Sequence, residues 1–168
     1  MKRSFLVVTG IVLLIVLVLI LVQMNYSNSY QKININGPAY MYGDSIDQVL
    51  PISIEGKYNK KKDSFIGSME IDNRIKLDNV LFIPGADIIF YEGSKRTDLG
   101  RMFFDNESLN YSMEITDPVF YEKLTKSSSD GKAKVIISSP SNNYEQAQRV
   151  NEELRNRSFP WENSIRSR

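Results

Sequence analysis

One uncharged run near the N-terminus constrains this chain more than any other feature of the sequence. Residues Phe5 to Val22 carry no charge, and only Thr9 and Gly10 interrupt the apolar side chains. As a helix with about 1.5 Å of rise per residue, this run would be roughly 27 Å long, close to the thickness of the hydrocarbon core of a bilayer. The run therefore predicts a transmembrane helix within an N-terminal signal-anchor over residues 1–24.

The charges around this run predict its orientation. Lys2 and Arg3 precede it, and the next basic residue is Lys32. The positive-inside rule then predicts a single-pass protein of the cell membrane with a cytoplasmic N-terminus, an extracytoplasmic remainder and bilayer contact through Phe5–Val22. A cleaved secretory signal is the alternative, although the apolar run is long for one and the best cleavage site, at residues 27–29, is poor.

The absence of two residue types limits the catalytic and metal-binding chemistry that this chain can support. It contains no cysteine and no histidine, which excludes disulfides, thiol nucleophiles, His-based triads and the common zinc sites. We therefore expect no metal and no cofactor. With 21 basic and 20 acidic residues the net charge is +1, which gives no reason to propose nucleic acid as the partner. A chain rich in Asn and Ile, poor in Ala and free of Cys also favours a bacterial source with an AT-rich genome.

Alternation of apolar and polar residues is the clearest structural signal beyond the N-terminal run. It extends over Leu50–Tyr58, Phe65–Ile71 and Leu109–Ile115. Since successive side chains of a strand point to opposite faces, each segment should have one buried and one solvated face. Four more segments resemble strands, at 80–83, 88–91, 99–104 and 134–138, and Pro84-Gly85 suits a type II turn. The pattern predicts one antiparallel sheet of about six or seven strands.

Two helices are predicted after most of these strands. Asp117 before Pro118 is typical of an N-cap, and Asn142 with Glu145 resembles a capping box. The predicted fold class is α+β, with both helices covering one side of the sheet. Residues 37–157 would form this exported domain, after a stalk at 25–36 and before a tail at 158–168. Lys32–Asn36 could instead be a first strand.

The aspartates near strand ends are the candidates for catalysis. Asp72, Asp87, Asp105 and Asp117 could converge as a pair of catalytic carboxylates, but aspartate at a strand end is ordinary turn chemistry. Asp105-Asn106-Glu107 could offer oxygen ligands to calcium but lacks the spacing of a calcium loop. Because no catalytic motif is present, we expect that the protein is not an enzyme.

Two segments are candidate binding sites. Lys57, Lys60, Lys61 and Lys62 form a basic hairpin tip, which is either a solvated turn or a contact for anionic headgroups or an anionic wall polymer. In the tail, Phe159, Trp161 and Arg166 belong to residue types favoured at interfaces. The tail either packs back onto the domain or serves as a docking peptide.

Together these patterns predict a membrane-anchored extracytoplasmic domain that binds a protein or an anionic polymer of the cell envelope. Two alternatives remain. One is a carboxylate-dependent hydrolase of the envelope. The other is a small accessory subunit of a membrane complex, for which the pair Thr9-Gly10 is the one small-residue contact in the apolar run.

Overall fold

The computed structural model describes residues 2–27, 29–43, 46–129 and 131–159, and these ranges contain three helices and eight strands. The helices are α1 (Lys2–Ser27), α2 (Pro118–Thr125) and α3 (Tyr144–Ser158). The strands are β1 (Tyr30–Gly43), β2 (Ile46–Asn59), β3 (Ser64–Ile71), β4 (Ile75–Phe82), β5 (Ala86–Glu92), β6 (Lys95–Phe104), β7 (Tyr111–Ile115) and β8 (Val135–Ser139). The strand alternative for Lys32–Asn36 is the one the structure shows, because these residues lie inside β1.

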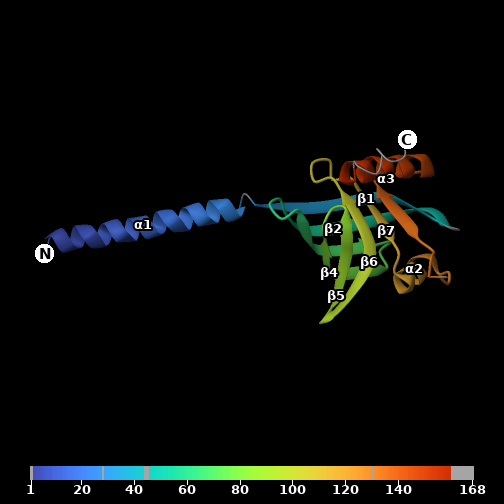
Figure 1. Cartoon of the computed structure of the whole chain (residues 1–168), viewed down its shortest axis with the longest axis horizontal. Coiled ribbons are helices and arrows are strands. Elements are labelled where there is room, and N and C mark those ends of the chain that lie inside the picture. Colours follow the sequence, from blue (N-terminus) through green and yellow to red (C-terminus); the bar gives the residue numbers. More distant parts are fainter. Residues whose placement is uncertain (1, 28, 44–45, 130, 160–168) are drawn as a thin grey trace.

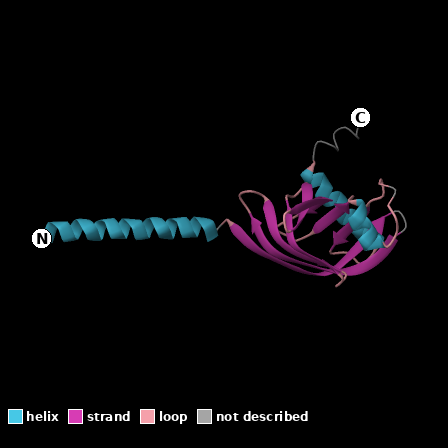
Figure 2. Ribbon diagram, turned by 90° about the horizontal axis from the view of Figure 1, so that it is seen from below, coloured by secondary structure: helices cyan, strands magenta, loops and turns pink. Residues whose placement is uncertain are grey.

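The eight strands form a closed up-and-down barrel rather than an open sheet (Figures 1 and 2). Each strand pairs antiparallel with the next, and β1 closes the barrel by pairing with β8 from Tyr40↔Ser138 to Gly43↔Val135. The predicted α+β fold, an open sheet of six or seven strands covered by two helices, is therefore wrong. Alternation along one segment shows which side chains are buried, but closure depends on pairing between strands about a hundred residues apart.

The helix α1 extends away from the barrel (Figures 1 and 2). Its large apolar side chains from Ile11 to Val22 are 46% to 66% exposed. Among the residues whose side chains are described, no helix combines the length and the apolar character needed to cross a membrane. This finding contradicts the predicted transmembrane signal-anchor over Phe5–Val22 and the single-pass, extracytoplasmic location derived from it.

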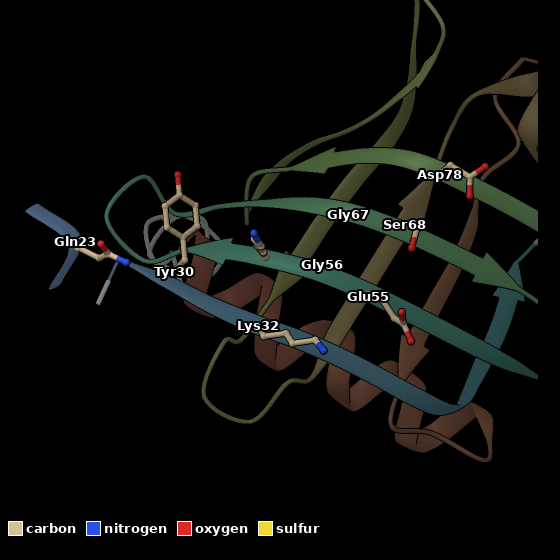
Figure 3. Close-up of a pocket in the computed structure, with 9 residues that line it drawn as sticks. Gln23, Tyr30, Lys32, Glu55, Gly56, Gly67, Ser68 and Asp78 are labelled. Carbon is tan, nitrogen blue, oxygen red and sulfur yellow. The ribbon is translucent and has the colours of Figure 1, made fainter. Parts of the chain in front are cut away.

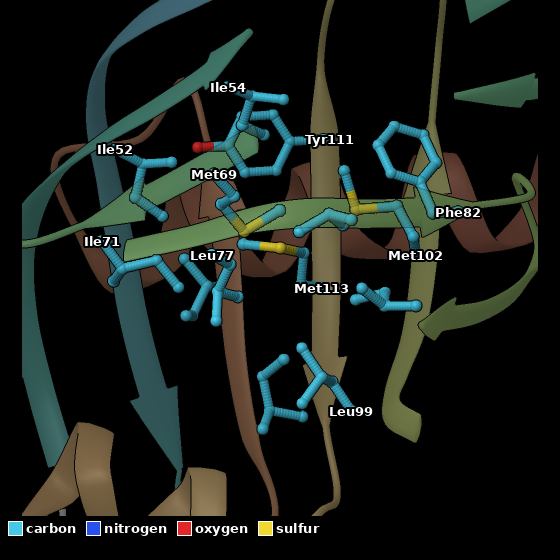
Figure 4. Packing of buried hydrophobic residues seen from close by; sticks show 14 of the residues in the cluster. Ile52, Ile54, Met69, Ile71, Leu77, Phe82, Leu99, Met102, Tyr111 and Met113 are labelled. Carbon is cyan, nitrogen blue, oxygen red and sulfur yellow. The ribbon is translucent and has the colours of Figure 1, made fainter. Parts of the chain in front are cut away.

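The core fills the inside of the barrel (Figure 4). Eight strands leave an interior about wide enough for side chains alone. Four methionines with at most 2% exposure contribute to it: Met41, Met69, Met102 and Met113. The ring of Tyr111 is fully buried among them. Side chains from opposite walls thus bury one another, and the barrel does not depend on a covering helix layer.

One helix, α3, packs along the outside of β1, β6, β7 and β8. Ser112 and Glu114 of β7 are buried beneath it, although the alternation of residues 109–115 predicts that they are solvated. The Ser112 and Ser138 hydroxyls lie 2.9 Å apart, and Arg155 of α3 donates to Glu114 over 3.4 Å. Strand β7 is therefore buried on both faces, while α2 follows it at the far end of the barrel.

Local signals in the sequence are largely confirmed. Asp117 is the N-cap of α2 and accepts a hydrogen bond from the Phe120 N–H at 2.7 Å. The turn at Pro84-Gly85 is present, and Gly85 has the positive φ of 76° that a type II turn requires. The N-cap of α3 is Asn143 rather than the predicted Asn142.

Candidate functional site

Two lysines lie directly opposite each other on the outer surface of the barrel. Lys32 of β1 and Lys57 of β2 are register partners, and both side chains are exposed. Like charges at directly opposed positions of an antiparallel pair destabilise it. Neither lysine forms an ion pair with a residue in the described ranges. The unliganded domain therefore keeps an unfavourable charge pair at this position.

Three more lysines extend this charge to the turn between β2 and β3. Lys60, Lys61 and Lys62 are all exposed there. The turn is held in place by the Asn59 side chain, whose Oδ1 accepts from the N–H groups of Lys61 and Lys62 at 3.0 and 3.1 Å. We call the five residues Lys32, Lys57, Lys60, Lys61 and Lys62 the basic face.

Two further hydrogen bonds fix the base of this turn. The Lys60 N–H donates to the carbonyl of Ser29 at 2.8 Å, which ties the turn to the start of β1. The hydroxyl of Tyr58 donates to the carboxylate of Asp63. The backbone that carries the lysines is thus ordered before any ligand arrives.

A shallow hollow of about 760 Å³ lies beside the basic face (Figure 3). Gln23 and Tyr30 lie at one end of it, and Ser68 and Asp78 lie at the other. Lys32 and Lys57 contribute to its lining. The hollow therefore continues the cationic surface of the basic face.

A pair of glycines forms the floor of the hollow. Gly56 and Gly67 are register partners on β2 and β3. A Cβ atom on either glycine would lie 2.6 Å from Cζ of Phe65 and 2.7 Å from the opposite Cα atom. Phe65 covers the glycines from inside the barrel, so the two strands approach closely only because both side chains are absent.

The far end of the hollow is acidic. The register of β3 and β4 shifts between Gly67 and Met69, which indicates a bulge with one extra residue on β4. Asp78 lies in this bulge and pairs with Lys76 at 3.7 Å. Glu55 also lines the hollow. The cationic character is thus confined to the end near the β2–β3 turn.

A second hollow, of about 510 Å³, contains two of the carboxylates in the chain, Asp63 and Asp105. Asp63 accepts from Tyr58, and Asp105 accepts from Arg157 at 2.7 Å. Burial acts to raise the pKa of Asp105, but hydrogen bonds from Glu107 and Ser108 and the charge of Arg157 outweigh it and hold this pKa below its usual value. The turn interpretation of Asp105 is therefore confirmed, because its Oδ1 accepts from the Glu107 N–H at 3.0 Å.

The tail residues are only partly described. Phe159 packs edge-on against Phe103, with ring centroids 6.0 Å apart, and it lines the second hollow together with Tyr58. Phe159 and the β2–β3 turn thus belong to the same end of the barrel. Trp161 and Arg166 lie outside the described residues.

Sequence reasoning grouped Lys57 with Lys60–Lys62 but missed Lys32 as their partner. The alternation around Ile33 places Lys32 on an outer face, but nothing local indicates which residue of another strand will lie opposite. In the described part of the chain no three acidic side chains gather closely enough to hold a metal ion. Asp105, the first residue of the possible calcium loop, is instead bonded to Arg157.

Comparisons with protein families, with characterised proteins and with solved structures give no match for this chain.

Proposed function

We propose that this protein is a non-catalytic binding domain that holds an anionic polymer on its basic face. The observation that carries the proposal is the direct opposition of Lys32 and Lys57 on exposed strand positions. Such a pair is unfavourable in the free domain. An anionic group between the two ammonium groups would convert this repulsion into attraction.

The shape of the basic face supports a linear ligand. Lys57 is on a strand and Lys60–Lys62 are in the turn that follows it, so the charges continue past the end of the sheet. The hydrogen bonds of Asn59 and the Lys60–Ser29 bond order this backbone. A chain with repeated negative charges could contact several lysines at once, and exposed contacts of this kind are weak singly but cooperate along a polymer.

The carboxylates support binding rather than hydrolysis. A glycosidase needs a general acid whose pKa is raised towards neutrality. Asp105, one of the two carboxylates in the second hollow, has a lowered pKa and an arginine partner. Asp63 in the same hollow accepts from Tyr58. These carboxylates serve turn geometry and packing in the account we propose.

The test is binding of fluorescently labelled inorganic polyphosphate to the full chain, followed by anisotropy at several salt concentrations. A triple variant with Lys60, Lys61 and Lys62 changed to Gln should bind at least about ten-fold more weakly. Wild-type binding should fade towards 1 M salt, where the screening length is about 3 Å. The matched control changes Lys123, Lys126 and Lys134 to Gln and removes the same charge elsewhere. Equal losses in the two triple variants would contradict a localised site.

A further inference from the structure

The wall of the closed barrel is paired over only part of the length of β4 and β5. These strands pair at only three positions, from Val80↔Phe90 to Phe82↔Ile88. Beyond Phe90, β5 pairs only with β6, and the residues of β4 before Val80 pair only with β3. The two strands therefore separate towards the β5–β6 turn, and the β5–β6 hairpin projects from the barrel (Figure 1).

A hollow of about 420 Å³ lies where these two strands separate. We call it the mouth. It lies at the end of the barrel opposite the basic face, and α2 forms one of its sides. Leu77, Phe90, Leu99 and Phe120 line it from β4, β5, β6 and α2. Val119 of α2 is 63% exposed and adds apolar surface. Its volume and its place at the end of a barrel are both typical of small-molecule sites.

The lining of the mouth contains three cations and three acids, so its formal charge is balanced. The cations are Lys95, Arg96 and Lys123, and no ion pair joins any of them to a described residue. Two of the acids are already engaged by backbone groups.

Those two acids are Asp98 and Asp117. Asp98 accepts from the Gly100 N–H at 3.2 Å, and Asp117 caps α2. Glu92 is the remaining acid of the lining. The three cations therefore remain free to pair with an anionic group of a ligand, whereas two of the three acids accept hydrogen bonds from the backbone.

We propose that the mouth binds a small apolar carboxylic acid. The apolar body of the ligand would lie against Phe90 and Val119, and its carboxylate would lie between Arg96 and Lys123. Apolar contact supplies the affinity, and the guanidinium and ammonium groups select the charged end of the ligand. This site stands apart from the basic face in position and in ligand size.

The probe is decanoate, measured by titration calorimetry with the full chain below the concentration at which decanoate forms micelles. Decanol has the same chain without the charge, and it should bind about ten-fold more weakly if the cations contribute as exposed ion pairs do. The double variant Arg96→Gln/Lys123→Gln should lose a similar factor. The matched control Lys126→Gln/Lys134→Gln should bind like the wild type.

Two further measurements separate the mouth from other apolar surfaces. Val119→Glu changes an exposed residue and should abolish decanoate binding while the fold stays intact by circular dichroism. A photoreactive decanoate analogue should cross-link to residues 90–99 or 117–123. Equal affinity for decanoate and decanol, an unchanged double variant, or cross-links confined to α1 would each overturn the proposal.

The variants also separate this site from the proposed function. Changing Lys60–Lys62 to Gln should weaken polyphosphate binding and leave decanoate binding unchanged. The mouth variant Arg96→Gln/Lys123→Gln should have the reverse effect. A peptide with an apolar C-terminal residue that displaces decanoate at lower concentration would assign the mouth to a protein terminus and contradict the small-molecule ligand.

Discussion

Ser112 of β7 donates a hydrogen bond to Oδ1 of Asn151 on α3 over 2.8 Å, and both residues are buried. The Ser138 hydroxyl of β8 lies 2.9 Å from that of Ser112, so one asparagine is linked to two strands. A buried polar group needs a specific partner, whereas apolar contacts tolerate sliding. The position of α3 along the barrel is therefore fixed by this network as well as by the apolar contacts of Ala147 and Leu154.

Removal of the Asn151 side chain tests this role. Asn151→Ala leaves the buried Ser112 hydroxyl without its acceptor, and we expect a loss of about 1–3 kcal/mol in the free energy of unfolding. Urea denaturation of the full chain measures it. The control is Gln148→Ala on the exposed side of α3, which should change stability by less than about 0.5 kcal/mol. Similar losses in both variants would contradict the network.

Tyr42 faces the same buried region and should make the protein sensitive to alkali. Burial, with smaller effects of Tyr144 and Glu114, raises the pKa of Tyr42 from 10.0 to about 12. The folded state thus favours the neutral phenol. Its contribution to stability is complete below pH 10 and is lost as the pH rises towards 12. Tyr42→Phe should reduce the loss of melting temperature across this interval, whereas Tyr91→Phe should leave the loss close to that of the wild type.

The glycine pair beneath the first hollow predicts a strong contrast between two similar substitutions. Gly67→Ala would place a Cβ atom against Phe65 and Gly56, and overpacking of this kind typically costs about 1–3 kcal/mol. Gly37→Ala in β1 meets no atom within 4 Å and should change stability by less than about 0.5 kcal/mol. Urea denaturation compares the two. Equal stabilities of the two variants would show that the strands can separate at Gly67 without loss.

Asp105 should contribute to stability against acid. Its pKa is held below the ordinary 3.8, because hydrogen bonds and the charge of Arg157 outweigh the effect of burial. The contribution is therefore present above about pH 4 and is lost as the pH falls through the lower pKa of the folded state. Asp105→Asn should be less stable than the wild type at pH 6, with the difference shrinking below pH 4. A difference that is constant with pH would contradict this assignment.

The sequence predicts local geometry better than the relations between distant strands. The alternation of residues 109–115 correctly places Tyr111 and Met113 in the core. It also predicts solvated positions for Ser112 and Glu114, and these are buried because a helix about forty residues later covers them. A pattern of period two reports the two faces of a strand, but it carries no information about what covers the outer one.

The candidate site also has one part that the sequence predicts and another part that depends on the pairing of distant strands. The turn that carries Lys60–Lys62 can be predicted, because polar residues separate two alternating segments. The opposition of Lys32 and Lys57 depends on the register of β1 and β2, and the closure of the barrel depends on β1 meeting β8. The partly paired wall between β4 and β5 likewise follows from where pairing stops. A local sequence pattern predicts none of these pairings between strands.

Removal of the charges of Lys32 and Lys57 should weaken polyphosphate binding and raise the stability of the domain. In Lys32→Gln/Lys57→Gln the like-charge repulsion disappears while the strands keep their register partners. We expect the free energy of unfolding to rise by a few tenths of a kcal/mol or more. Polyphosphate binding should weaken at the same time, because two of the five cations of the site are gone.

The measurement that tests the central claim most directly is therefore the polyphosphate affinity of Lys32→Gln/Lys57→Gln beside its stability in urea. The control Lys126→Gln/Lys134→Gln removes the same charge outside the basic face. The account predicts a variant that is at least as stable as the wild type and binds polyphosphate about ten-fold more weakly than the control does. Affinity equal to that of the control would contradict the basic face as the binding site.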